Sequence, residues 1–125
     1  MEAGAPRKIL VVDDSSTMRQ LLKMVLAKSV ACEVTEAADG LAAIERLREG
    51  TFDIVLSDVN MPRLDGLGFV AAVRQQLKSE VPIVMITTKG GEEDRDRGLA
   101  LGANSYMTKP INGAQVVRVI SSLLG

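Results

Sequence analysis

Hydrophobic residues in this chain fall into short runs of two kinds, and the runs predict strands that alternate with helices. Three runs are apolar throughout, at residues 9–12, 54–56 and 83–86, as is typical of parallel strands buried on both faces. Residues 32–36 alternate between apolar and polar positions, and residues 105–107 form a short mixed run. These two segments are therefore predicted to be strands at the edges of the sheet.

Between these strands, apolar residues recur at the spacing of one helical face. The predicted helices lie at about residues 18–26, 40–50, 66–77, 92–101 and 113–124, with Asn112 as the cap of the last one. The helix at 92–101 is the weakest, because its first half is charged and glycines stand at 98 and 102. The charged run Glu92–Arg97 is expected to be a solvated helix face.

The alternation predicts an α/β fold of the (βα)5 type, a doubly wound five-stranded parallel sheet that is flavodoxin-like. No linker, repeat or low-complexity tract interrupts it, so residues 1–125 are expected to form one domain. With the apolar strands inside and the mixed strands outside, right-handed crossovers leave 2-1-3-4-5 as the simplest strand order. The order then changes direction between the first and third strands, which is where such sheets bind ligands.

Composition excludes several classes of function. A formal net charge of −1 gives no basic surface for nucleic acid, and no apolar stretch approaches the roughly 20 residues of a membrane span. Without an apolar leader in residues 1–8, and with Cys32 as the one cysteine, we expect a cytoplasmic protein. The chain has no histidine, which excludes a histidine-based triad or zinc site. Chemistry must therefore depend on carboxylates, hydroxyls and lysine.

Such side chains follow the predicted strands. Asp13 and Asp14 follow the first strand, Asp58 the third, Thr87 the fourth and Lys109 the fifth. Because parallel strands end at the same edge of a sheet, we expect the three carboxylates to converge there with the lysine ammonium. Like charges so close together require a cation, and Mg²⁺ prefers oxygen ligands of this kind. Asp58, at the centre, is the expected nucleophile toward phosphorus.

Together these motifs resemble the response regulator receiver domain of bacterial two-component signalling, in particular its single-domain chemotaxis type. The resemblance covers residues 7–124. Its motifs are Val-Val-Asp13-Asp14-Ser, Asp58-Val-Asn60-Met-Pro62-Arg-Leu-Asp65-Gly66, Ile-Thr87-Thr88 and Tyr106-Met-Thr-Lys109-Pro110.

The resemblance implies a role for each of these residues. Asp58 would accept a phosphoryl group from the phosphohistidine of a histidine kinase. Asp14 and Asp58 would bind Mg²⁺, or Mn²⁺ in its place, with the backbone carbonyl of Asn60, and Asp13 would act mostly through water. Beyond catalysing its own phosphorylation and dephosphorylation, such a protein is not an enzyme.

The resemblance also implies how the signal is passed on. Lys109 and Thr87 would contact the phosphoryl oxygens, and Tyr106 would turn inward when Thr87 moves. A target protein would bind the face formed by the helix at 92–101, the fifth strand and the last helix. A phosphatase is a further partner of this type, the protein is expected to be a monomer without an output domain, and the Lys109–Pro110 bond is expected to be cis.

Three alternatives remain open at this stage. The chain could be a receiver module cut from a larger hybrid kinase or regulator. It could be a small Mg²⁺-dependent phosphatase with an aspartate nucleophile, although haloacid dehalogenase-like enzymes carry Asp-x-Asp after the first strand and here the pair is adjacent. It could be a flavodoxin-like electron carrier, although Asp13 and Asp14 would repel the phosphate of FMN.

Overall fold

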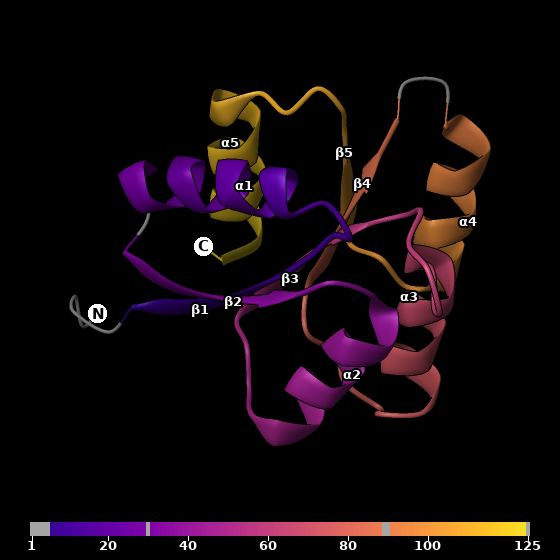
Figure 1. The fold of residues 1–125 in the computed structure, drawn as a ribbon. Helices are drawn as coiled ribbons and strands as arrows, with labels where there is room; N and C mark the ends of the chain where they lie inside the picture. The colour runs from indigo at the N-terminus through magenta and orange to yellow at the C-terminus, as the bar shows by residue number, and fades with distance from the viewer. Residues whose placement is uncertain (1–5, 30, 89–90, 125) are drawn as a thin grey trace.

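Strands and helices alternate along the described chain (Figure 1). The computed structural model describes residues 6–29, 31–88 and 91–124. Its strands are β1 (Arg7–Val12), β2 (Cys32–Ala37), β3 (Ile54–Asp58), β4 (Ile83–Thr87) and β5 (Ser105–Thr108). Its helices are α1 (Ser16–Ser29), α2 (Gly40–Glu49), α3 (Gly66–Gln75), α4 (Glu92–Leu101) and α5 (Gly113–Leu124).

The strands form one parallel sheet in the order β2-β1-β3-β4-β5, which confirms the predicted topology. β1 lies between β2 and β3, with Ile9 opposite Ile54 and Val12 opposite Ser57. β1, β3 and β4 are the inner strands, and β3 and β4 are buried along their whole length. The strand order therefore changes direction between β1 and β3, so the carboxyl ends of these two parallel strands are neighbours.

Helices cover both faces of the sheet, as Figure 1 shows: α1 and α5 lie on one face, and α2, α3 and α4 lie on the other. Because successive side chains of a strand point to opposite faces, each inner strand contributes to two cores. Ile9 and Val11 of β1 pack with α1 and α5, whereas Leu10 and Val12 pack with α2 and α3. Each fully buried aliphatic side chain stabilises the fold by roughly 1.5–3 kcal/mol, and the continuous apolar runs are what provide both cores.

The helix ends follow local chemistry. The Asn112 side chain accepts from the amide of Gln115, as its predicted capping role requires. The third helix ends at Gln75 and not near Leu77 as predicted, because the Leu77 amide bonds to the Ala72 carbonyl and Lys78 has a left-handed backbone with φ 56°.

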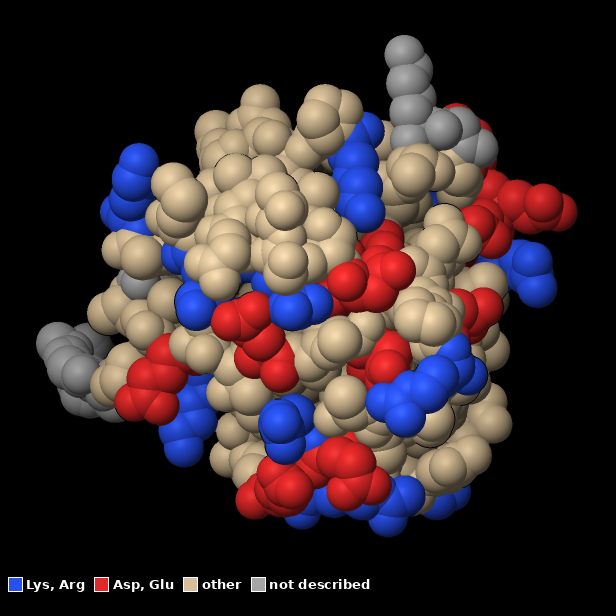
Figure 2. Space-filling view, viewed as in Figure 1, with Lys and Arg blue, Asp and Glu red and all other residues tan. Residues whose placement is uncertain are grey.

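The surface carries charges of both signs. On the face shown in Figure 2, acidic and basic side chains of the described residues are interspersed, and no broad basic area covers it. None of the helices in the described part of the chain has the length and apolarity that a membrane span requires.

Candidate functional site

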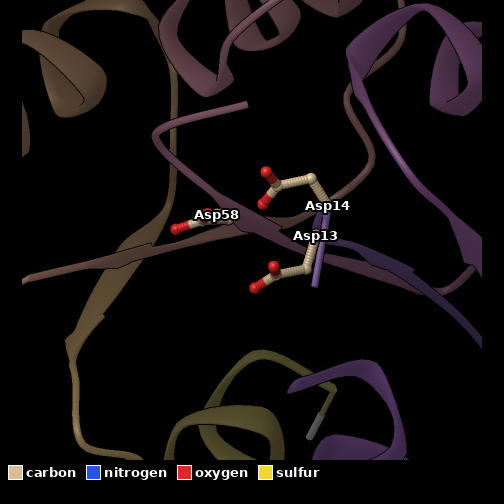
Figure 3. A group of neighbouring side chains, drawn as sticks. All are labelled: Asp13, Asp14 and Asp58. Carbon is tan, nitrogen blue, oxygen red and sulfur yellow. The ribbon is translucent and has the colours of Figure 1, made fainter. Parts of the chain in front are cut away.

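Three carboxylates meet at the carboxyl ends of β1 and β3. Asp13 and Asp14 follow β1, Asp58 is the last residue of β3, and one oxygen of each lies within 4.8 Å of the others. Figure 3 shows the three side chains side by side at this edge of the sheet. Asp13 and Asp58 are buried, with 1% and 5% of their surfaces exposed, and Asp14 is exposed. The strand ends predicted this convergence.

The backbone around the cluster is held by short contacts. The Asp13 amide donates to the carbonyl of Ala37 on β2, and the Asp13 side chain accepts from the Ser15 amide at 2.8 Å. On the other side, the first residue of α3, Gly66, donates its amide to the Val59 carbonyl at 2.7 Å. A Cβ atom on Gly66 would lie only 2.4 Å from the Asp58 carbonyl oxygen, so only glycine lets α3 approach β3 this closely.

Lys109 supplies a positive charge beside the cluster. Its ammonium lies 3.2 Å from an Asp58 carboxylate oxygen and 3.7 Å from an Asp13 oxygen. The backbone amide of Lys109 donates to the Thr87 carbonyl at 2.7 Å, and the Lys109–Pro110 bond is cis, as expected. Lys109 therefore approaches Asp58 from the end of β5, on the far side of β4.

One ammonium does not balance three carboxylates. Burial, and then the charge of Asp13, raise the pKa of Asp58 above its usual value, while Lys109 acts in the opposite direction. The second oxygen of Asp13 is buried and has no hydrogen-bond partner within the described structure. This is the oxygen that lies 3.7 Å from the Lys109 ammonium, beyond hydrogen-bond distance, and a buried carboxylate oxygen normally also accepts a hydrogen bond or binds a metal. These hard oxygen donors fit a divalent cation such as Mg²⁺.

The remaining predicted site residues come from the loop after β3, the end of β4 and the outer strand β5. Asn60 is exposed in the loop after β3, two residues from Asp58. Thr87, the last residue of β4, is 4% exposed, and its hydroxyl donates to the Thr88 carbonyl at 3.2 Å. Tyr106 lies on β5 opposite Met85 and is half-buried.

A cavity of about 230 Å³ separates Thr87 from Tyr106, and Arg95 of α4 lines it too. Arg95 donates to the Tyr106 hydroxyl at 3.0 Å, and its guanidinium lies 5.0 Å from the centre of the ring. The charged run Glu92–Arg97 was predicted to be a solvated helix face, and Arg95 of this run is half-buried and also contacts Tyr106. The local sequence could not predict the contact between Arg95 and Tyr106, because α4 and β5 meet only in the folded chain.

Comparisons with known proteins agree with the site. Residues 9–121 match the response regulator receiver domain. Chemotaxis protein CheY1 of Helicobacter pylori is 38% identical over 120 residues, which cover 94% of this chain and 97% of that protein. Transcriptional regulatory protein ResD of Bacillus subtilis is also 38% identical, but the match covers 99% of this chain and 50% of ResD.

A solved structure gives the same result for the fold. The chemotaxis response regulator CheY4 of Vibrio cholerae superposes with a TM-score of 0.87 at 37% identity, and the match covers 96% of this chain and 100% of CheY4. The strand order, the carboxylates at the strand ends and the nearly complete sequence match lead to the same conclusion. The chain belongs to the response regulator receiver domain family.

Proposed function

We propose that Asp58 is the phosphoryl acceptor of this receiver domain and that a histidine kinase supplies the phosphoryl group. The observation that carries the proposal is the Lys109 ammonium 3.2 Å from the Asp58 carboxylate, inside a group of three carboxylates. A nucleophilic carboxylate, a fixed cation and oxygen donors for a metal are the parts that phosphoryl transfer requires.

In the proposed reaction, an Asp58 carboxylate oxygen attacks the phosphorus of a phosphohistidine. The new P–O bond forms as the P–N bond breaks, and the imidazole nitrogen leaves with the electron pair. Lys109 pairs with a phosphoryl oxygen, and the Thr87 hydroxyl donates to another after leaving the Thr88 carbonyl. Asp14, Asp58 and the Asn60 carbonyl would hold Mg²⁺ directly and Asp13 mostly through water, and the ion would neutralise negative charge on the transferring group.

The proposed output is a shift between two arrangements of Thr87 and Tyr106. When Thr87 turns toward the phosphoryl group, the Tyr106 ring has the adjacent cavity of about 230 Å³ to occupy. Turning inward would break the hydrogen bond from Arg95 and change the surface of α4, β5 and α5. A target protein that binds one arrangement more tightly would then read the phosphorylation state.

Whether this receiver domain acts alone or as part of a longer regulator is also a matter of proposal. CheY1 is described as a chemotaxis protein, and its nearly complete coverage supports a chemotaxis-type role for a stand-alone receiver. The match to half of ResD supports the alternative, in which the receiver is one module of a longer regulator. The phosphoryl chemistry at Asp58 is the same in both cases.

The test is labelling with a small phosphodonor. Wild-type protein incubated with acetyl phosphate and Mg²⁺ should gain one phosphoryl group, and removal of Mg²⁺ with EDTA should prevent the labelling. Asp58→Asn should abolish it, because the amide is not a nucleophile. Asp65→Asn is the control, because Asp65 caps α3 outside the cluster and asparagine retains the capping oxygen. Undiminished labelling of Asp58→Asn would place the nucleophile elsewhere.

A further inference from the structure

The loop from Val59 to Gly66 joins β3 to α3. A hydrogen bond between its two ends closes its base, and residues 63 and 64 attach it to the start of α2. At the base, the Gly66 amide donates to the Val59 carbonyl at 2.7 Å. The attachment to α2 includes a backbone bond: the Leu64 carbonyl accepts from the amide of Gly40, the first residue of α2, at 3.1 Å. Asn60 lies between these attachments, and within the described chain no hydrogen bond joins it to another element.

A second attachment of the loop to the start of α2 comes from Arg63. Its guanidinium donates to both carboxylate oxygens of Asp39, from Nε at 2.7 Å and from Nη2 at 3.0 Å. A bidentate pair of this kind fixes direction as well as distance. The Arg63 guanidinium holds the pKa of Asp39 below its usual value, so the pair stays ionised near neutral pH.

The partner of Arg63 is itself firmly placed. Asp39 is only 6% exposed, and its side chain also caps α2 by accepting from the Ala42 amide at 2.9 Å. The approach between α2 and the loop is tight, because a Cβ atom on Gly40 would lie 2.5 Å from the Leu64 carbonyl oxygen. The start of α2 is therefore a rigid anchor, and Arg63 binds the loop to it.

Arg63 makes its ion pair with Asp39 from a strained backbone conformation. Its φ is 66°, in the left-handed region, where residues other than glycine are strained by about 1–2 kcal/mol. Glycine would adopt this conformation without strain, but it has no side chain that could reach Asp39. The arginine therefore retains a strained backbone together with an attachment that glycine could not make. Strain of this kind concentrates at functional sites.

We infer that Arg63 is a positioning residue for the metal site. Through Asp39, it holds the loop that carries Asn60, whose carbonyl is proposed to bind the cation together with the carboxylate cluster. The inference rests on the proposed function, because it assigns that carbonyl to the bound cation. Loss of the attachment would leave the loop free to move between its base and Leu64, and the cation would bind more weakly.

The two possible roles of Arg63, as a positive charge or as a positioning residue, predict opposite changes in Mg²⁺ affinity for Arg63→Gly. If Arg63 acted only as a positive charge near the acidic cluster, its removal would tighten Mg²⁺ binding. If it positions the loop, its removal weakens Mg²⁺ binding although a repulsive charge has gone. The sign of the change therefore separates the two roles. The glycine also suits the left-handed backbone, so the variant removes the side chain without adding strain.

The experiment is a Mg²⁺ titration of the unphosphorylated protein, followed by NMR, with thermal melts to check folding. We expect Arg63→Gly to raise the Mg²⁺ dissociation constant by roughly fivefold, a little below the ~10–100-fold cost of losing a direct outer-shell partner. Arg46→Gln is the control, since it removes one arginine and its exposed pair with Glu49 on α2, and it should leave the constant unchanged.

A second variant tests the anchor. Asp39→Asn can still cap α2 but loses the ionic pair, and it should weaken Mg²⁺ binding in the same direction; adding it to Arg63→Gly should produce little further change. An unchanged or lower dissociation constant in Arg63→Gly, or in Asp39→Asn if the first variant does not fold, would overturn the positioning role alone. A wild-type protein that binds no Mg²⁺ would overturn the proposed function.

Discussion

Asp58 is a buried carboxylate beside another buried carboxylate, Asp13, and Lys109 is the neighbouring cation. Burial and repulsion raise its pKa, so the metal-free protein carries an ionised group that the fold does not fully compensate. The folded protein gives up stability at this position. The same arrangement suits a carboxylate that is to bind a cation and attack phosphorus.

The raised pKa predicts how stability depends on pH. Because the folded pKa of Asp58 lies above its unfolded value, its contribution to stability is greatest at low pH and is lost as pH rises through the folded pKa. In EDTA at pH 8, Asp58→Asn should therefore melt at a higher temperature than wild type, by about 3–5 °C for each kcal/mol of relieved repulsion.

Thermal melts across a pH series measure this difference. It should shrink as the pH falls toward the range in which Asp58 of the wild type takes up its proton. Asp65→Asn, which changes an exposed capping carboxylate outside the cluster, should not raise the melting temperature at pH 8. An Asp58→Asn variant that melts at or below the wild-type temperature at pH 8 would contradict the electrostatic account.

At the scale of elements, α4 is the helix that is held least by apolar burial. Among the described residues of this helix only Gly98 is buried, and it packs on Met85 of β4. The helix gains stability from acidic residues in its first turn, which favour the positive end of its dipole, and from the bond between Arg95 and Tyr106. An element held by few apolar contacts is suited to move during a two-state change.

Tyr106 can report this change directly, because it is the one tyrosine in a chain without tryptophan. Adding Mg²⁺ and beryllofluoride, which mimics the phosphoryl group, should change the tyrosine fluorescence of the wild type. Arg95→Gln should favour the inward ring by about two- to thirteenfold before any addition, the equivalent of one lost hydrogen bond of about 0.5–1.5 kcal/mol.

Thr87→Ala is the control for this fluorescence change, because it removes the hydroxyl that is proposed to follow the phosphoryl oxygens. It should bind beryllofluoride with little change in emission. If the wild type binds beryllofluoride and its emission stays the same, the switch does not involve Tyr106.

Across the whole molecule, the sheet and its site were predictable for a physical reason. Burial on both faces produces continuous apolar runs, which identify the inner strands, and parallel strands bring their carboxyl ends to one edge. Asp13, Asp58 and Lys109 come together through that geometry alone. The roles of these side chains in phosphoryl transfer remain predictions.

Side-chain contacts between distant elements were not predictable. Arg63 reaches Asp39 across 24 residues, from a left-handed backbone that its own residue type does not favour. Arg95 looked like one charge among several on a solvated helix, because nothing local marks the tyrosine that it meets on β5. Both contacts depend on the finished packing of α2 against the loop and of α4 against β5.

The most direct test of the account is to identify the residue that accepts the phosphoryl group. Wild-type protein labelled with acetyl phosphate and Mg²⁺ would be reduced with borohydride, which converts an aspartyl phosphate to homoserine, and then digested and sequenced by tandem mass spectrometry. The account predicts homoserine at position 58, and none when EDTA replaces Mg²⁺. Homoserine at another aspartate, or a phosphoryl group retained on a hydroxyl, would contradict it.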